Sequence, residues 1–163
     1  MNITIFNEFH ESQRKGKASK FYPNGIHYEL KKGLSAENSD LVITTITQED
    51  PGNGFTKELL KNTDVLIWWS EIWNEQILSD VVTSVTKRIK EGMGFIALYG
   101  ANQSKVFKEL MDTTCASTKN NKCATVKLIS LDPTHPICKG INFPVTFKDS
   151  GILSEPFDVP TPE

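Results

Sequence analysis

The chain has 163 residues, the length of one ordinary domain, and a chain of this size buries about two thirds of its unfolded surface. Its 18 Lys and Arg residues against 20 Asp and Glu residues give a formal net charge of -2, which argues against a nucleic-acid partner. The basic cluster within residues 14–20 is typical of a solvated loop.

No apolar run approaches the ~20 residues that a membrane span requires, and the first residues do not read as a signal peptide. We therefore expect a cytoplasmic protein without a membrane partner. The cysteines Cys115, Cys123 and Cys138 lie outside any CxxC unit. Cys115 and Cys123 could form a disulfide in an oxidising compartment, but free thiols fit the expected location better.

The first predicted strand is the short apolar run at residues 3–6. The polar residues after it show no regular pattern, and a helix is predicted from Pro23 onward, with Gly33 as its stop signal. The apolar residues at helical spacing in this segment are Ile26, Leu30 and Leu34. The β-branched run at residues 41–46 predicts the second strand.

Turn residues follow at 50–54, and Thr56 is a predicted N-cap for a short helix. The four apolar residues 65–68 predict a third strand that is buried on both faces. The next helix is predicted to stop at Gly92, and its apolar face contains Ile77, Val81, Val85 and Ile89.

Residues 94–100 predict the fourth strand, and Ser104 is a predicted N-cap for the helix that follows it. The pattern weakens after Asp112, where residues 124–131 predict one more strand before a turn-rich loop and an extended, proline-rich end. Strands that alternate with helices predict parallel pairing and a three-layer α/β fold. We expect residues 1–163 to form a single domain of this class.

Polar and aromatic side chains follow three of the predicted strands. Because ligands of an open parallel sheet bind beyond the carboxyl ends of its strands, these side chains mark the expected site. They are Asn7, Glu8, His10, Trp69, Glu71, Tyr99, Asn102 and Gln103, and His27 lies at the predicted helix start. Carboxylates, amides, imidazole and aromatic rings together suit a sugar, whose hydroxyls need donors and acceptors and whose C–H face stacks on a ring.

Several segments resemble one known family in the order in which that family has them. They are "FNEFHE", "YPNGIH", "TDVLIWW", "VTKRIKEGMGFIALYG", "SKVFKELM", "DPTHPICKGI" and "SEPFDVP". The chain resembles the trehalose-utilisation (ThuA-like) family across nearly its whole length. The resemblance implies a flavodoxin-like parallel sheet, similar to class I glutamine amidotransferases, and a role in the metabolism of trehalose or a related disaccharide or keto-sugar. It also implies that the C-terminal part usual in the family is missing.

The chain departs from this family at its histidines. The family typically reads W-W-G-H-x-x-H where this chain has residues 68–74, and L-H-S-G-H-x-S-K where it has 98–105, so four family histidines are replaced. Imidazole is a common metal ligand and titrates near neutral pH, so these replacements affect chemistry rather than fold. Glu8, His10, His27 and Glu71 could still bind a metal, although we do not favour one. The turn "LYGANQSK" has no nucleophile elbow, which excludes glutaminase chemistry.

Two functions remain open. In the first, the protein binds a sugar through Asn7, His27, Trp69, Tyr99, Asn102 and Gln103, and the predicted catalytic residues Glu8, His10 and Glu71 exchange protons with it. In the second, the chain is a non-catalytic module for binding or assembly. Structural roles are open alternatives for His27 at a helix end and for Trp69 in a core. An exposed Trp73 would suit a contact in a homo-oligomer.

Overall fold

The computed structural model describes the backbone of residues 1–158, with the side chains of 117–124 and 149–157 left out. The described chain divides into two compact units, one containing Met1–Cys115 and the other the described residues from Ala116 onward. The expectation of a single domain stays a prediction.

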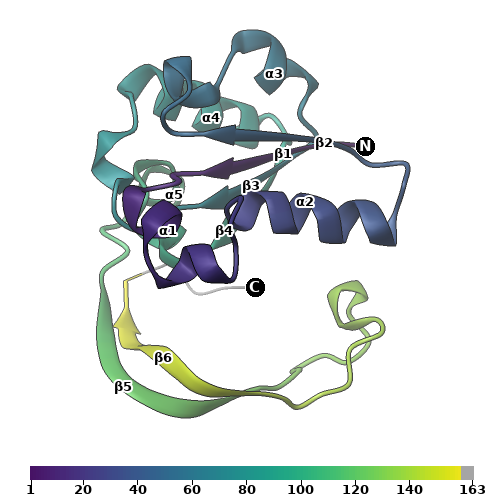
Figure 1. Cartoon of the computed structure of the whole chain (residues 1–163), viewed down its shortest axis with the longest axis vertical. Helices are drawn as coiled ribbons and strands as arrows, with labels where there is room; N and C mark the ends of the chain where they lie inside the picture. Colours follow the sequence, from purple (N-terminus) through teal and green to yellow (C-terminus); the bar gives the residue numbers. More distant parts are fainter. Residues whose placement is uncertain (159–163) are drawn as a thin grey trace. The chain divides into compact units, whose positions relative to one another are not determined.

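The first unit contains a four-stranded parallel sheet. Its strands are β1 (Asn2–Asn7), β2 (Val42–Thr47), β3 (Val65–Trp69) and β4 (Gly94–Leu98), in the order β2-β1-β3-β4 (Figure 1). All three pairings are parallel. With helices on both faces, this sheet confirms the predicted three-layer, flavodoxin-like α/β fold.

The helices divide between the two faces of the sheet. Helix α2 (Ile26–Glu37) covers one face, and α3 (Lys57–Asn62), α4 (Ser79–Lys90) and α5 (Lys105–Met111) cover the other (Figure 1). This division follows from right-handed crossovers, because the chain reverses direction along the sheet between its first and second connections. We call these sides the α2 face and the α4 face.

Successive side chains of each strand point to opposite faces of the sheet, so each face has its own hydrophobic core. On the α2 face, Leu30 and Leu34 pack against the buried side chains of Ile3, Ile5, Ile43 and Ile67. On the α4 face, a larger cluster contains Phe6, Leu66, Trp68, Val81, Val85 and Val106. Trp68 is fully buried there and its ring lies 4.2 Å from that of Phe6, centroid to centroid.

Side-chain caps set the starts of two helices, as the sequence predicts. The hydroxyl of Thr56 accepts a hydrogen bond from the backbone N–H of Leu59, and that of Ser104 accepts one from Phe107. The prediction for Gly33 is wrong, because α2 continues past it to Glu37. A glycine inside a helix costs only about 1 kcal/mol, and packing of the following Leu34 against the sheet offsets that cost.

The polar segment after β1 is more regular than its sequence suggests. It forms the short helix α1 (Glu11–Lys15) and a 3-10 turn, η1 (Lys17–Lys20). The imidazole of His10 caps α1 by accepting a hydrogen bond from the backbone N–H of Ser12. Helices this short contain too few residues for an apolar periodicity, so no sequence pattern predicts them.

The second unit is an antiparallel pair of long strands, β5 (Ser117–Leu128) and β6 (Val145–Phe157), which Figure 1 shows as curved ribbons. The predicted strand at 124–131 overlaps the end of β5, which begins earlier. A single 3-10 turn, η5 (Pro136–Cys138), is described in the predicted turn-rich segment. The proline-rich end from residue 159 lies outside the described residues.

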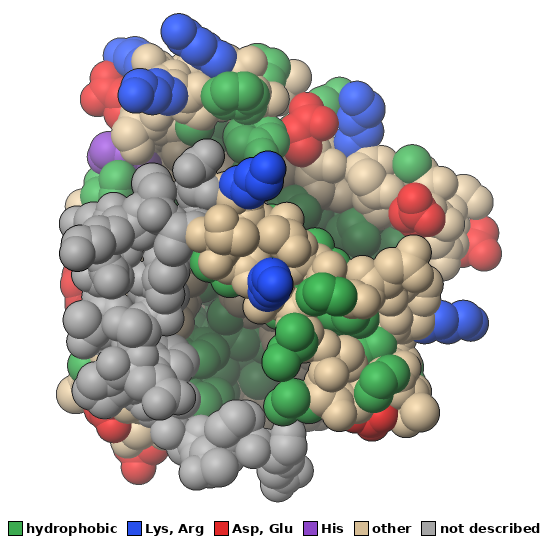
Figure 2. Space-filling model, turned by 90° about the horizontal axis from the view of Figure 1, so that it is seen from below, with side chains coloured by type: hydrophobic (Ala, Val, Ile, Leu, Met, Phe, Trp, Pro, Cys, Tyr) green, Lys and Arg blue, Asp and Glu red, His purple; other side chains and the backbone are tan. Residues whose placement is uncertain are grey.

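Within the described residues, no helix has the length and the apolar character needed to cross a membrane. Figure 2 shows acidic and basic side chains interspersed on the face that it presents, in keeping with the formal net charge of -2. Cys115 and Cys138 are free thiols, as expected, and the side chain of Cys123 lies outside the described ones.

Candidate functional site

The predicted site residues lie where the parallel strands end. Asn7 is in register with Thr47 on β2 and with Trp69 on β3, and Trp69 is in register with Leu98 on β4, so the strands end level with one another. Register partners on parallel strands point to the same face. Asn7 therefore shares the α2 face with Ile5 and Trp69, whereas the next residue, Glu8, turns toward the α4 face.

Asn7 and His27 form a buried pair on the α2 face. Asn7 is fully buried, and its Oδ1 accepts a hydrogen bond from the backbone N–H of Phe9 at 2.9 Å. Its Nδ2 lies 2.8 Å from Nδ1 of His27. Because the amide oxygen is already an acceptor, Nδ2 is the donor, and Nδ1 of His27 must be unprotonated. The neutral imidazole therefore has its proton on Nε2.

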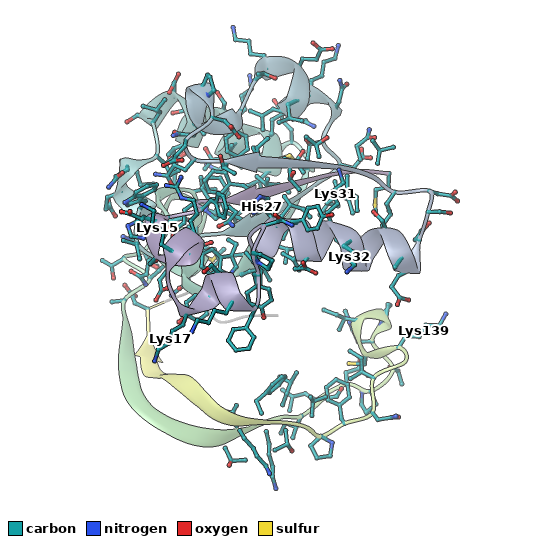
Figure 3. All side chains as sticks on the ribbon, viewed as in Figure 1. Lys15, Lys17, His27, Lys31, Lys32 and Lys139 are labelled. Atoms are coloured by element: carbon teal, nitrogen blue, oxygen red, sulfur yellow. The ribbon has the colours of Figure 1, made fainter. Side chains whose placement is uncertain are left out.

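Burial keeps His27 neutral. The side chain lies at the start of α2 (Figure 3), and burial lowers its pKa from the ordinary value, while the negative charge of Asp50 opposes this shift. Gly25 makes room for the ring: it has a φ of 83°, and a Cβ there would lie 2.5 Å from the imidazole and 2.7 Å from the ring of Phe9. The Phe9 and His27 rings meet edge to face at 5.0 Å.

Trp69 and Tyr99 form a second pair on this edge, which we call the aromatic pair. Their rings are stacked, with centroids 5.9 Å apart and planes 5° from parallel. Tyr99 follows β4 with a φ of 55°, a left-handed conformation that turns the chain sharply out of the strand. Its side chain is 63% exposed, so one aromatic surface at the end of the sheet is open to a ligand.

Asn102 and Gln103 lie in the 3-10 turn after β4, η4 (Tyr99–Gln103). Gln103 is engaged within the unit, because its Nε2 donates to the backbone carbonyl of Cys115. Nδ2 of Asn102 is buried and has no hydrogen-bond partner among the described residues. A buried donor without an acceptor is unfavourable, so this amide is a candidate for a contact with a ligand or a water molecule.

Glu8 is fully buried, and both of its oxygens are occupied. Its Oε2 accepts hydrogen bonds from three consecutive backbone N–H groups, those of Glu71, Ile72 and Trp73, each at 2.9 Å. Its Oε1 accepts a longer bond, at 3.3 Å, from Nε2 of Gln13. The carboxylate thus connects β1 to residues 70–73, which we call the β3 loop.

Of the other two predicted catalytic residues, Glu71 belongs to this loop and His10 lies beside it. Nδ1 of His10 accepts the capping bond of α1, and the imidazole meets the ring of Trp73 edge to face at 4.6 Å. The side chain of Glu71 is exposed, while its backbone N–H donates to Glu8. The structure therefore brings Glu8, His10 and Glu71 together around the β3 loop, apart from the Asn7 and His27 pair.

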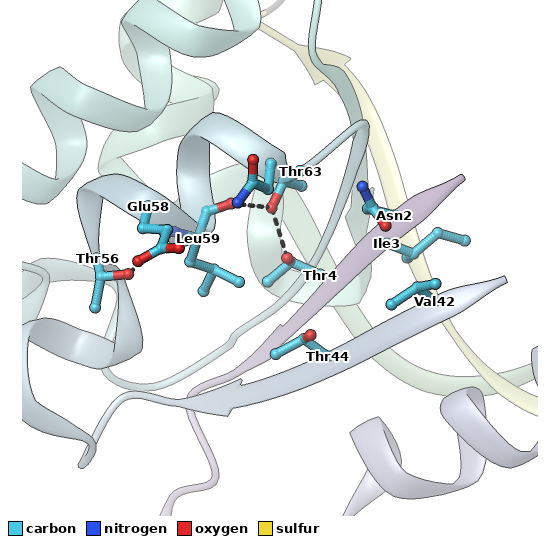
Figure 4. A pocket seen from close by; sticks show the side chains of 10 residues that line it. Asn2, Ile3, Thr4, Val42, Thr44, Thr56, Glu58, Leu59 and Thr63 are labelled. Carbon is cyan, nitrogen blue, oxygen red and sulfur yellow. Dashed lines mark hydrogen bonds between the residues drawn. The ribbon is translucent and has the colours of Figure 1, made fainter.

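A cavity of about 460 Å³ opens at the other end of the sheet, beside α3 (Figure 4). It contains none of the predicted site residues. Its lining residues are Asn2, Ile3, Thr4, Val42, Thr44, Thr56, Glu58, Leu59, Asn62 and Thr63. The hydroxyl groups of Thr4 and Thr63 bond to each other there at 2.7 Å. Because the cavity lies at the amino ends of β1 and β2, it is not part of the site at the carboxyl ends.

The family model for trehalose utilisation, ThuA, matches residues 2–151. The chain belongs to this family. The match contains the whole parallel sheet and every residue of the candidate ThuA site, which confirms the resemblance seen in the motifs. A search of curated proteins found no match.

Sequence reasoning missed several residues that organise this ThuA site. Gln48 follows β2 directly, is 7% exposed, and donates from Nε2 to the carbonyl of Trp73 at 3.2 Å. Asn74 donates to the carbonyls of Glu71 and Gly100 at 3.2 Å each, which connects the loops after β3 and β4. A polar residue immediately after a buried strand was a usable signal for Gln48. The position of Asn74 gave no such signal.

The described residues contain no group of three His, Cys, Asp or Glu side chains that could hold a metal ion. In particular, Glu8 has its oxygens occupied and His27 has its Nδ1 bonded to Asn7. At the carboxyl ends of the strands, the described residues offer hydrogen-bond donors, His27 Nε2–H and the amide of Asn102, together with the aromatic pair.

Proposed function

We propose that this ThuA-family protein binds a carbohydrate, trehalose or a related disaccharide or keto-sugar, at the carboxyl ends of its parallel strands. The stacked aromatic pair, with its exposed Tyr99, is the observation that supports this proposal most. Sugar rings present C–H faces that pack on aromatic rings, and a tyrosine adds a hydroxyl at the rim. A cytoplasmic location and the absence of nucleic-acid and membrane partners stay predictions.

Polar groups near the aromatic pair suit the hydroxyls of a sugar. The bond from Asn7 fixes His27 in the tautomer that has Nε2–H, which is a donor, and the amide of Asn102 offers a second one. Donors that need no rearrangement lower the entropic cost of binding. We assign Asn7 to orienting His27, and the aromatic pair, His27 and Asn102 to the ligand. Gln103 would act indirectly, because its bond to the carbonyl of Cys115 holds the η4 turn in position.

The occupied carboxylate of Glu8 favours the second candidate function, a non-catalytic ThuA module. A residue that exchanges protons with a substrate must reach it within hydrogen-bond distance, and Glu8 is fully buried against the protein's own N–H groups. In a catalytic version of the protein, proton transfer would fall to His10 and Glu71. We therefore propose that the protein binds a sugar in either case, and that any catalysis would depend on His10 and Glu71.

The test is a calorimetric titration of the protein with trehalose, other disaccharides and their oxidised keto forms. Binding of one sugar, weakened roughly tenfold by Tyr99→Ala, is the expected result, because the variant removes about 1.4 kcal/mol of stacking. Tyr28→Ala is the matched control, since Tyr28 is also an exposed tyrosine, at 48%, but lies on α2. Equal affinities for all three proteins would refute the site, and no binding by the unmodified protein would refute the function.

A further inference from the structure

The contact between Glu8 and the β3 loop has an unusual form. Three successive backbone N–H groups, from Glu71 to Trp73, point at a single carboxylate oxygen. Consecutive N–H groups that converge in this way form a concave nest, an arrangement that proteins use to bind anions. In this protein the anion is part of the chain, supplied by a residue more than 60 positions earlier in the sequence.

The carboxylate and the loop stabilise each other. A buried carboxylate is strongly unfavourable unless hydrogen bonds compensate it, and bonds to an ionised acceptor are roughly twice as strong as neutral ones. Conversely, successive N–H groups in a regular helix or strand bond to separate carbonyls, whereas those of Glu71, Ile72 and Trp73 converge on one point. Their shared conformation requires one acceptor at their centre, and Glu8 supplies it.

We propose that Glu8 is a positioning residue: its carboxylate fills the backbone nest of the β3 loop and so fixes the aromatic pair in place. Two contacts connect the β3 loop to the aromatic pair. Asn74, just after the loop, bonds to the carbonyl of Gly100, and Gly100 lies so close to the loop that a Cβ there would be 2.8 Å from the carbonyl of Ser70. Tyr99 precedes Gly100, so the loop determines where the exposed ring lies.

The experiment is a rescue of Glu8→Ala by acetate or formate. The variant empties a carboxylate-sized space in front of the nest, and a small carboxylate added to the buffer can occupy it. In ¹H–¹⁵N spectra, we expect the amide signals of residues 71–73 to move in the variant and to return toward their original positions with saturating acetate. Chloride at equal ionic strength should not return them. Glu75→Gln is the control, because Glu75 is an exposed carboxylate that pairs with Lys108.

The sugar readout rests on the proposed function, and the amide readout does not. If the unmodified protein binds a sugar, Glu8→Ala should lower the affinity roughly tenfold, and acetate should restore it, whereas acetate should leave the unmodified protein unchanged. If the proposed function is wrong, neither the unmodified protein nor any variant binds a sugar, but acetate still returns the amide signals of Glu8→Ala. Absence of the amide rescue, with sugar binding still present, would overturn the positioning role alone.

A second variant covers the case in which Glu8→Ala does not fold. Glu8→Gln keeps the shape and one carbonyl acceptor but removes the charge. We expect folded protein whose amide signals at residues 71–73 shift upfield, because their hydrogen bonds lose the ionic acceptor. Signals of these three residues that match the unmodified protein would show that the nest does not depend on an anion, and would overturn the proposal.

Discussion

Asn7 and Glu8 are neighbours at the end of β1, and both are fully buried, yet they serve opposite faces of the sheet in different ways. Asn7 joins a neutral pair with His27 beside an exposed aromatic surface. Glu8 places a charge inside the protein, where backbone N–H groups surround it. The two polar residues at the carboxyl end of β1 therefore differ in role: Asn7 orients a group at the proposed ligand site, and Glu8 holds a loop beside it.

The largest expected loss of stability comes from removal of the Glu8 carboxylate. Glu8→Ala removes a fully buried carboxylate and leaves three converging N–H groups without their shared acceptor, so the free energy of unfolding should fall by about 3–5 kcal/mol. Urea denaturation followed by circular dichroism measures this change. Glu75→Gln, which alters an exposed carboxylate, should change the same quantity by less than about 1 kcal/mol. A loss equal to that of the control would mean that the nest contributes nothing to stability.

Asn7→Leu tests the other face with a side chain of similar size. The backbone N–H of Phe9 and Nδ1 of His27 both lose their partner, so we expect the free energy of unfolding to fall by about 2 kcal/mol. The loss should be smaller than that of Glu8→Ala, because the groups left behind are neutral. The same urea titration decides the order of the two, and a larger loss for Asn7→Leu would reverse the comparison.

The neutral state of His27 predicts a dependence of stability on pH. Burial makes its pKa lower in the folded protein than in the unfolded chain, where it is about 6.5. As the pH falls below about 6.5, the unfolded chain binds a proton before the folded protein does, so stability decreases until the pH reaches the lowered pKa and then levels off. Above pH 6.5 this contribution is fully present.

His27→Gln should remove that part of the pH dependence. The measurement is the difference in free energy of unfolding between the two proteins at pH 7.5 and at several values below 6.5. The other titratable groups are present in both proteins, so their contribution to the pH dependence cancels in the difference. Parallel pH curves for the two proteins would mean that His27 is not held neutral by its contacts.

The sequence predicted the parts of this molecule that depend on side-chain type. Apolar runs located all four strands of the sheet, the hydroxyls of Thr56 and Ser104 located two helix starts, and the rule for parallel sheets located the edge where Asn7 and Trp69 meet. Gly33 misled the prediction because packing of Leu34 outweighs its weak helix propensity.

The role of Glu8 could not be predicted in the same way. Its partners are backbone N–H groups, which every residue except proline has, so no residue type at positions 71–73 announces the contact. Only the path of the β3 loop brings the three groups together. The tautomer of His27 was equally hidden, since it follows from the bond between the Phe9 backbone and Asn7.

The smallest expected effect comes from a residue that resembles Glu8 in position. Gln48→Leu removes the bond from Nε2 to the carbonyl of Trp73, but that carbonyl still accepts a hydrogen bond from the backbone N–H of Gln76 at 2.9 Å. The variant also removes Oε1 of Gln48, which is buried without a partner among the described residues, and this relief offsets the lost bond. We expect the free energy of unfolding to change by less than about 1 kcal/mol.

Gln48→Leu therefore separates two explanations for the β3 loop. If the loop is held by the charge of Glu8, a neutral contact on the same residue, Trp73, can be lost with little effect, and the amide signals of 71–73 should stay nearly in place. If general packing between the ends of β1, β2 and β3 holds the loop, Gln48→Leu and Glu8→Ala should be similarly destabilising in the urea titration. A difference of several kcal/mol between them is the result that an anion nest requires.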